Sequence, residues 1–166
     1  MDALFEQHVA QNPGLTAFAI LQAAIRLTEE SKNERGLDLF AALLIPPLVF
    51  HRKTALALEG RQMTDGLFLR MIAEERELAA GLNERLIDLT PRTFRAIHLG
   101  CSTKLFRLVK TDKLEIFPLL RSLPGILHSN QVPQSVTTIL AAAKRLGYCF
   151  ATTELPTVTT LLRARL

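Results

Sequence analysis

Two side chains in the second half of the chain have a spacing that could bind a metal ion. His98 and Cys101 are three residues apart, and on a helix this spacing brings both side chains to one face. Tetrahedral zinc needs four such ligands, or three and a water, and no second pair stands nearby. Both residues also belong to an apolar stripe. We therefore interpret them as a core histidine beside a core cysteine, and we expect no metal and no other cofactor.

The sequence also lacks the common catalytic motifs. It contains no glycine-rich phosphate-binding loop, no G-x-S-x-G nucleophile elbow and no H-E-x-x-H zinc motif. Glu74, Glu75 and Glu77 form an acidic cluster, but this is more simply the solvated face of a helix. The histidines are scattered along the chain. These observations point away from an enzyme and favour a binding function.

Most of the positive charge lies in the second half of the chain. Residues 1–88 carry a net charge of −4 and residues 89–166 a net charge of +8, within a total of +4. Such a basic half fits a nucleic-acid face or an acidic protein face. A plain solvated surface is the third interpretation. The candidate partner or DNA face consists of six cations: Arg92, Arg95, Lys104, Arg107, Lys110 and Lys113.

The composition is apolar for a soluble chain. Apolar residues make up 48% of the 166 residues, whereas a membrane span needs about 20 of them in a row. The best stretch, residues 37–50, contains Asp38 and two prolines, and the N-terminus lacks the cationic region of a signal peptide. We expect one cytoplasmic domain over residues 1–166, with no membrane contact, free thiols at Cys101 and Cys149, and a protein partner over part of the surface.

Hydrophobic periodicity predicts a mainly α-helical fold with one small β-hairpin. It predicts buried helices over residues 15–27 and 37–45, and amphipathic helices over residues 67–82 and from residue 134 onward. A short helix or turn is expected over residues 53–60, a hairpin with a polar tip over residues 105–118, and a loop over residues 119–133.

The hairpin follows a further predicted helix. Thr90 and Pro91 have the pattern of an N-cap and a first helical residue. The apolar stripe of this helix is Phe94, Ile97, His98, Cys101 and Leu105. Helix and hairpin together, residues 90–118, resemble half of a winged helix, in which the helix enters a DNA groove and the wing touches phosphates. Winged helices also serve as protein-docking modules, so this unit alone does not decide the function.

The most apolar stretch of the chain contains two prolines. Pro46 lacks an N–H and disfavours helical geometry at the residue before it, so the helix is predicted to end near Ile45. Leu48 to Phe50 would then be extended, and would either thread the core or dock on a partner; a plain helix–loop–helix turn is the other interpretation. The cationic residues that follow would return the chain to solvent or meet an acidic partner. The candidate docking residues are Pro46, Pro47, Leu48, Phe50, His51, Arg52 and Lys53.

Three segments carry a resemblance to a known family. They are QNPGLTAFAI, LDLFAALLIPPLVFHRKTALAL and LAAAKRLGYCFATTELPTVTTLL, in this order, and the likeness runs from Asn12 to Leu162. The chain resembles the middle component of bacterial three-component ABC ATPase systems, the small subunit of Lamassu-type anti-phage defence complexes. Family members often end in a Gly-Val-Arg-Pro-like sequence, whereas this sequence reads Leu162-Arg163-Ala164-Arg165-Leu166, so no role is carried over to these last residues.

The resemblance implies a non-catalytic accessory subunit. Its partners would be an SMC/Rad50-like ABC ATPase, whose head it would bridge to a nuclease-type effector subunit. DNA would be contacted through the complex. The alternative from a different class is a stand-alone winged-helix DNA-binding regulator, which we would expect to be a homodimer because a palindromic site has two-fold symmetry.

Overall fold

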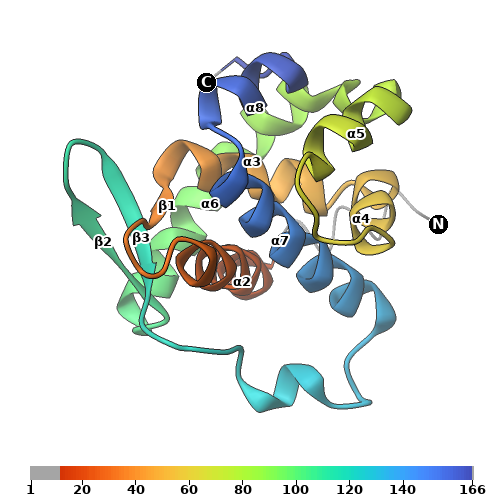
Figure 1. The fold of residues 1–166 in the computed structure, drawn as a ribbon. Coiled ribbons are helices and arrows are strands. Elements are labelled where there is room, and N and C mark those ends of the chain that lie inside the picture. The colour runs from red at the N-terminus through yellow and green to blue at the C-terminus, as the bar shows by residue number, and fades with distance from the viewer. Residues whose placement is uncertain (1–11, 166) are drawn as a thin grey trace.

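The structure, a computed structural model, describes residues 12–165. It is mainly helical with one small antiparallel sheet, which confirms the predicted class (Figure 1). The expectation about a signal peptide concerns residues 1–11 and lies outside the described residues. In chain order the elements are α2 (Pro13–Glu30), β1 (Leu37–Asp38), α3 (Leu39–Val49), α4 (Arg52–Glu59), α5 (Leu67–Glu74), the 3-10 helix η1 (Arg76–Ala79), α6 (Leu82–Ser102), β2 (Phe106–Lys110), β3 (Leu114–Pro118), the 3-10 helix η2 (Gly125–His128), α7 (Gln134–Thr152) and α8 (Leu155–Leu162).

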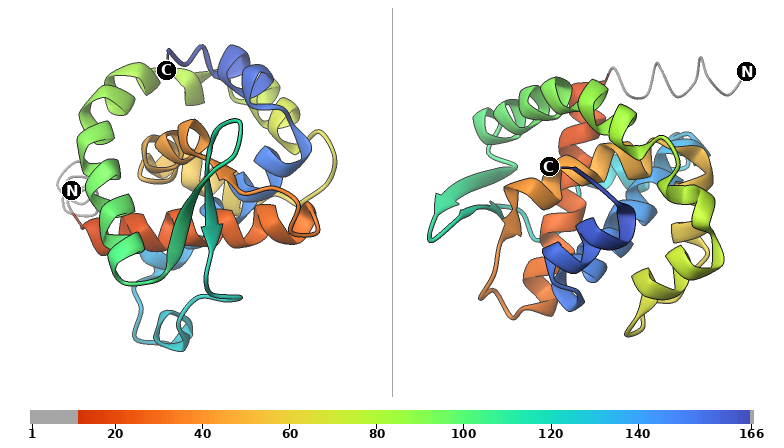
Figure 2. Two further views of the ribbon diagram at one scale, coloured as in Figure 1. Left: turned by 90° about the vertical axis from the view of Figure 1, so that its left-hand side faces the viewer. Right: turned by 90° about the horizontal axis from the view of Figure 1, so that it is seen from above.

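Helices α2 and α7 form the centre of the core (Figures 1 and 2). Helix α2 begins at Pro13, two residues before its predicted start, because the Asn12 side chain accepts hydrogen bonds from the backbone N–H groups of Gly14 and Leu15 at 2.9 and 3.1 Å. The two helices touch at Gly147, where an added Cβ would lie 2.3 Å from the carbonyl oxygen of Ala23. Only glycine allows this approach of one backbone to the other.

The sheet contains the predicted hairpin and a third strand that the sequence did not reveal. Strands β2 and β3 pair in antiparallel register, and β1 pairs with the other side of β3, which gives the order β1-β3-β2. Leu37 on β1 lies opposite Ile116 on β3, and both are fully buried. Leu37 and Asp38 had been predicted as the start of a helix. Two residues are too few to show the alternation by which strands are recognised.

Helix α3 does not end at Ile45 as predicted. It runs through Pro46 and Pro47 to Val49, so the prediction of an extended segment over Leu48–Phe50 is wrong. The prolines remove two helical N–H donors. All ten residues from Ala41 to Phe50 are buried, however, and this packing outweighs the local cost. The Phe50 N–H donates to the Pro46 carbonyl at 3.0 Å, and Arg85 Nε donates to the Pro47 carbonyl at 3.1 Å.

Helix α6 begins nine residues earlier than predicted, at Leu82 instead of Pro91. It starts after Gly81, whose φ of 66° suits glycine, and it passes through Pro91. Thr90 is not the N-cap; its hydroxyl donates to the carbonyl of Leu86. The helix that was predicted over residues 67–82 is instead broken at Glu75 into α5 and η1. Sequence patterns located these helical segments but misplaced their ends.

Among residues 12–165 no single helix is long and apolar enough to cross a membrane. Helices α3 and α4 would reach that length and composition only together, and they are bent by 102° relative to each other.

Candidate interaction surface

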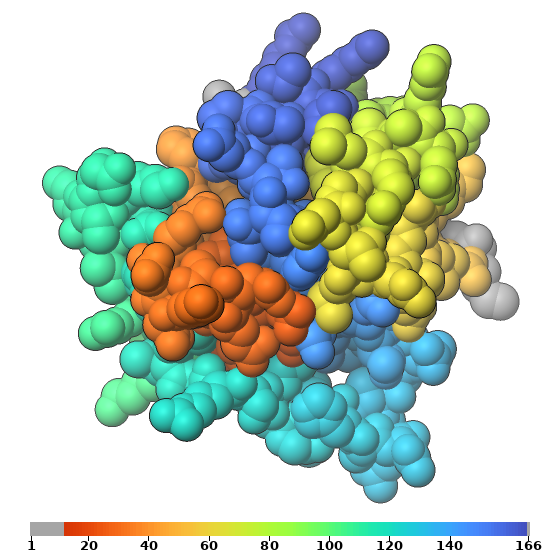
Figure 3. Space-filling model, in the orientation of Figure 1, coloured from red at the N-terminus to blue at the C-terminus, as the bar shows by residue number. Residues whose placement is uncertain are grey.

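The β2–β3 hairpin projects from the helical body (Figures 1 and 3). At its base the Phe106 ring lies directly on Gly100 of α6, where an added Cβ would come within 2.1 Å of the ring. The Leu105 N–H donates to the Gly100 carbonyl at 2.9 Å. At its tip the Thr111 N–H donates to the Lys113 carbonyl at 2.9 Å. The base of the hairpin is therefore anchored on α6, and its tip is closed by a hydrogen bond within the hairpin itself.

In the structure, five of the six predicted cations fall into two groups, and the sixth, Lys113, forms an ion pair. Arg92 and Arg95 lie on α6 beside the start of α2, where they line a cavity of about 630 Å³. Lys104 lies in the turn between α6 and β2, and Arg107 and Lys110 are exposed on β2. Lys113 forms an ion pair with Asp38 at 3.4 Å. We call Arg92 and Arg95 the helix cations, and Lys104, Arg107 and Lys110 the hairpin cations.

Neither group is neutralised by the residues that the structure describes. No ion pair joins a helix cation or a hairpin cation to an acid within residues 12–165. The acids of the hairpin are engaged elsewhere: Thr111 Oγ1 donates to Asp112 at 2.9 Å and to Glu115 at 3.2 Å. The hydrogen bond from Thr111 is the main cause that lowers the pKa of Asp112. Positive charge is therefore available to an acidic partner.

The predicted apolar stripe of α6 is only partly in the core. Ile97 is buried and Cys101 is half-buried, but Phe94 is 47% exposed and His98 is exposed. The interpretation of His98 as a core histidine is therefore wrong. The buried face of the helix is instead made by Leu86, Leu89, Thr93, Ala96 and Gly100 among others. No group of three or more potential metal ligands occurs within residues 12–165.

Both cysteines are free, but their surroundings differ. Burial raises the pKa of the Cys149 thiol to about 12. Burial also raises the pKa of the Cys101 thiol, and the backbone N–H of Leu108, which donates towards the sulfur, opposes this shift. The contact between Cys101 and Leu108 places this face of α6 against strand β2.

The candidate docking segment around the two prolines lies mostly inside the molecule. Pro46, Pro47, Leu48 and Phe50 are buried, and the half-buried ring of His51 is hydrogen-bonded to the Thr54 hydroxyl at 2.8 Å. Arg52 and Lys53 are exposed, and Lys53 Nζ lies 3.8 Å from Glu77. Docking through this segment stays a prediction. A partner at this surface would meet Arg52 and Lys53.

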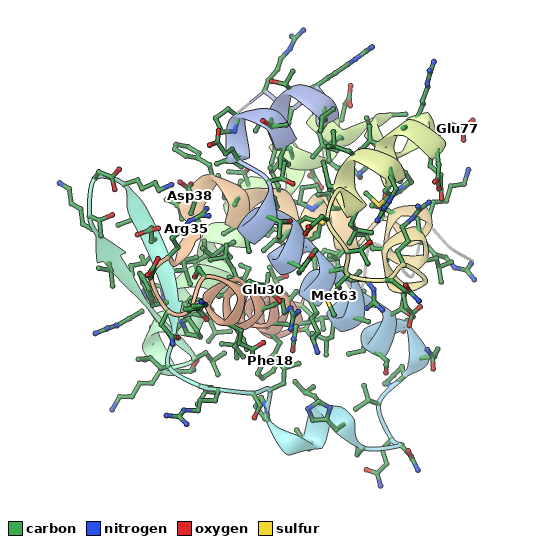
Figure 4. All side chains as sticks on the ribbon, viewed as in Figure 1. Phe18, Glu30, Arg35, Asp38, Met63 and Glu77 are labelled. Carbon is green, nitrogen blue, oxygen red and sulfur yellow. The ribbon has the colours of Figure 1, made fainter. Side chains whose placement is uncertain are left out.

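Other polar contacts tie separate elements together. Arg61 forms ion pairs with Glu74 at 2.6 Å and with Glu75 at 3.4 Å, and its backbone carbonyl accepts from Arg145 Nε at 2.8 Å. Arg35 and Asp38 lie near each other beside the sheet (Figure 4). The two Arg35 Nη atoms reach the carbonyls of α7 at 3.4 and 3.5 Å. We interpret these contacts as structural.

The sequence analysis missed one feature of this surface. Strand β2 is one of the two outer strands of the sheet, and Leu108 in its middle is 40% exposed. The exposed Phe94 on α6 and Leu108 on β2 are apolar side chains of the kind that partner proteins cover. An edge strand cannot be identified from local sequence, because the order of the strands depends on the distant pairing of β1.

Comparison with known proteins agrees with the resemblance noted in the sequence. No curated protein and no solved structure matches the chain. One family model matches residues 2–166, and its description is ABC-three component system Middle Component 3. Because this match covers nearly the whole chain, the protein belongs to the Middle Component 3 family of ABC-three component systems.

Proposed function

We propose that this chain is a non-catalytic assembly subunit that bridges an SMC/Rad50-like ABC ATPase head and a nuclease-type effector. The setting would be a Lamassu-type anti-phage defence complex. The observation that carries the proposal is the surface of the projecting hairpin, where unneutralised cations on β2 flank the exposed Leu108, together with the exposed Phe94 on α6. The family description, which makes the chain one component of a three-component system, also supports a role in assembly.

A winged-helix-like unit is part of this proposal. Helix α2, the short strand β1 and helix α3 are followed, after an intervening helical segment, by α6, β2 and β3. The strand order β1-β3-β2 places β1 beside the hairpin. This order of elements supports the assignment of α6 as the helix before the wing. Such a unit can dock on protein as well as on nucleic acid.

DNA contact within the complex is the second candidate function for the same half of the chain. It is favoured by Arg92 and Arg95, which share one face of α6 and line a cavity beside the start of α2. Cations on one helix face can approach successive phosphates. We assign the hairpin cations to the protein partner and the helix cations to this possible DNA contact.

Two double variants separate these roles in the assembled complex. The chain is co-expressed with its two partner components, either as wild type or with Arg107→Glu and Lys110→Glu, or with Arg92→Glu and Arg95→Glu. We expect the hairpin variant to lose co-purification. We expect the helix variant to assemble normally, and its DNA affinity to depend less steeply on salt, by about one counterion per lost phosphate contact.

Exposed cations elsewhere provide the control. Arg70→Glu with Arg76→Glu makes the same change of charge at exposed positions of α5 and η1, on the side of the molecule opposite the hairpin (Figure 1). This control should alter neither assembly nor the salt dependence. If the wild-type chain binds neither partner component, the bridging role is wrong. If all three variants assemble and bind DNA equally, the charge is a solvated surface. ATP hydrolysis by the pure chain that a point mutation in it abolishes would contradict the non-catalytic role.

A further inference from the structure

The outer edge of strand β2 presents backbone groups that the sheet does not use. In an antiparallel pair, alternate residues bond to the partner strand and the residues between them point away from it. Bonds from the Leu119 N–H to the Leu105 carbonyl and from the Thr111 N–H to the Lys113 carbonyl fix this alternation at both ends of the hairpin. The backbone groups of Phe106, Leu108 and Lys110 therefore point outward, and we call them the β2 edge.

Helix α6 covers one end of the β2 edge and leaves the other end open. The Phe106 ring lies on Gly100 of α6, and the Leu105 N–H donates to the Gly100 carbonyl at 2.9 Å, so the end of the strand near Phe106 lies against the helix. The Leu108 N–H, which is near enough to oppose the rise that burial causes in the pKa of the Cys101 thiol, belongs to this covered end. No other described strand lies beyond β2. Within residues 12–165, the Leu108 carbonyl and the N–H and carbonyl of Lys110 are then the backbone groups available to a further strand.

Apolar side chains flank this open end. Phe94 precedes Cys101 by seven residues, or two helical turns, so both side chains lie on the same face of α6. Phe94 is 47% exposed and Leu108 is 40% exposed. A strand placed along the β2 edge would cover Leu108 and lie beside this face of α6.

The charges around the edge indicate what kind of strand fits. Arg107 and Lys110 lie on opposite faces of β2, because successive residues of a strand alternate between faces. Lys104 stands at the base of the hairpin, and none of the three has an ion pair within the described residues. Two copies of this edge would bring like charges together, and charged edge strands oppose such self-pairing. An acidic segment would meet opposite charge on both faces.

We propose that the β2 edge binds an extended, acidic segment of another component of the complex, which adds a fourth strand to the sheet. Main-chain hydrogen bonds would provide much of the affinity, and the flanking side chains would provide the specificity. This inference rests on the proposed role in assembly, and it identifies both the site of contact and the chemistry of the partner.

A proline at position 110 tests the backbone contact separately from the charge. The Lys110 N–H points away from β3, so Lys110→Pro removes a donor from the β2 edge and leaves the bonds of the hairpin in place. Lys110→Ala removes the same charge and keeps the N–H, which makes it the matched control. We expect Lys110→Ala to weaken assembly roughly twofold to fivefold, as for an exposed ion pair. We expect Lys110→Pro to weaken it about tenfold further, because a carbonyl of the partner loses its donor.

Folding of the proline variant is checked on the same samples. The isolated Lys110→Pro chain should melt within about 2 °C of Lys110→Ala, as expected for a change that leaves the packing intact. If it does not, Leu108→Asp provides a second test, because it places a like charge in the path of an acidic strand at an exposed site. Normal assembly of Leu108→Asp would contradict the proposal.

The two cysteines provide a second readout that needs no mutation. Cys101 is half-buried next to the β2 edge, whereas Cys149 is buried in the core. Iodoacetamide should alkylate Cys101 in the isolated chain, and assembly with the partner components should slow this reaction at least tenfold. Cys149 should be unreactive in both samples and therefore serves as an internal control.

Each other outcome overturns the proposal in a recognisable way. If wild type assembles but Lys110→Pro matches Lys110→Ala and Cys101 stays reactive, the β2 edge is not the contact and the assembly role survives. If duplex DNA alone protects Cys101, the edge binds nucleic acid. If alkylation of Cys101 slows when the concentration of the isolated chain is raised, the edge binds a second copy of the chain. Failure of wild type to assemble would overturn the assembly role and this inference together.

Discussion

The core around α2 and α7 and the region around α6 and the hairpin use similar residues in different ways. Phe150 on α7 and Phe94 on α6 each belong to an apolar stripe with helical spacing, yet Phe150 is 3% exposed and Phe94 is 47% exposed. Phe150 has other elements of the chain packed over it. Phe94 lies on the face of α6 that also carries Cys101, and the described residues leave about half of its side chain uncovered. The same pattern thus forms a core in one place and an uncovered surface in the other.

This contrast separates stability from assembly. Burial of an apolar side chain stabilises the fold only where the chain itself supplies the covering atoms. A side chain that is left half-exposed contributes little to the fold, but it can contribute to binding when a partner covers it. Mutations in the core should therefore lower the stability of the chain, whereas mutations in the region around α6 and the hairpin should weaken complex formation with little change in stability.

The largest expected effect is at Phe150. Phe150→Asp should unfold the isolated chain, because the loss of a buried Phe costs about 3–5 kcal/mol and an unpaired buried charge adds to this. Circular dichroism and thermal melting will measure the loss of helix. If the variant melts like wild type, Phe150 is not part of the core and the contrast between the two regions fails.

Gly147→Ala tests the contact between the two central helices. Alanine favours helix by about 1 kcal/mol over glycine, but here its Cβ would meet the backbone of Ala23 at 2.3 Å, so α2 and α7 must move apart. We expect a net destabilisation of about 2 kcal/mol in urea unfolding. Gly125→Ala is the control, because an added Cβ there meets nothing within 4 Å. Equal stability of the two variants would show that the helices are not in this contact.

The pH dependence of stability reports on burial at Cys149. Burial raises the pKa of its thiol to about 12 in the folded chain, from an ordinary value of 9.0. The folded state therefore holds this proton more tightly, and its contribution to stability is complete below pH 9 and is lost as the pH rises from 9 towards 12. Between pH 9 and pH 10 the loss should be about 1 kcal/mol.

The Cys149→Ala variant separates the contribution of this thiol to the pH dependence of stability from the contributions of lysine and tyrosine side chains. Its stability should fall less steeply than that of wild type over the same pH range, whatever its stability at pH 7. Parallel curves for the two proteins would mean that Cys149 is accessible to water. Cys101, which is only half-buried, should show a smaller difference when it is changed to alanine in the same way.

The smallest effect on stability is expected at Phe94. Phe94→Asp should change the free energy of unfolding by at most about 0.5 kcal/mol, as is usual for exposed positions. The same variant should weaken assembly with the partner components. A loss of stability comparable to that of Phe150→Asp would show that Phe94 is a core residue, and it would remove the distinction between the two regions.

The sequence predicted the elements whose signals are local. Asn12 and Pro13 mark the start of α2, a polar tip between two apolar runs marks the hairpin, and regular spacing from residue 134 onward marks α7. The hairpin and the start of α7 lie where the residues alone place them, whereas α2 begins two residues before and ends three residues after its predicted range of 15–27. Each signal combines capping or turn residues, or a regular hydrophobic spacing, over the length of a whole strand or of several helical turns.

The elements that were missed depend on contacts between distant parts of the chain. Pro46 and Pro91 are signals for the end or the start of a helix, yet both lie inside helices that are held by tertiary packing. Strand β1 exists only because β3, almost eighty residues later, pairs with it. The open edge of β2 follows from that pairing. The positively charged residues of the candidate site could therefore be predicted from the sequence, but the geometry of the site could not.

The packing of α2 against α7 has a consequence for the order in which the chain folds during synthesis. Helix α2 leaves the ribosome first, and the element that covers most of it is made more than one hundred residues later. For most of translation the apolar side chains of α2 have no native partner, and such exposed segments associate with chaperones or with other chains. At about 5–20 residues per second, this interval lasts on the order of 10 s. A truncated chain that lacks α7 should therefore be retained by chaperones, and a ribosome stall before residue 134 should expose α2 to added protease.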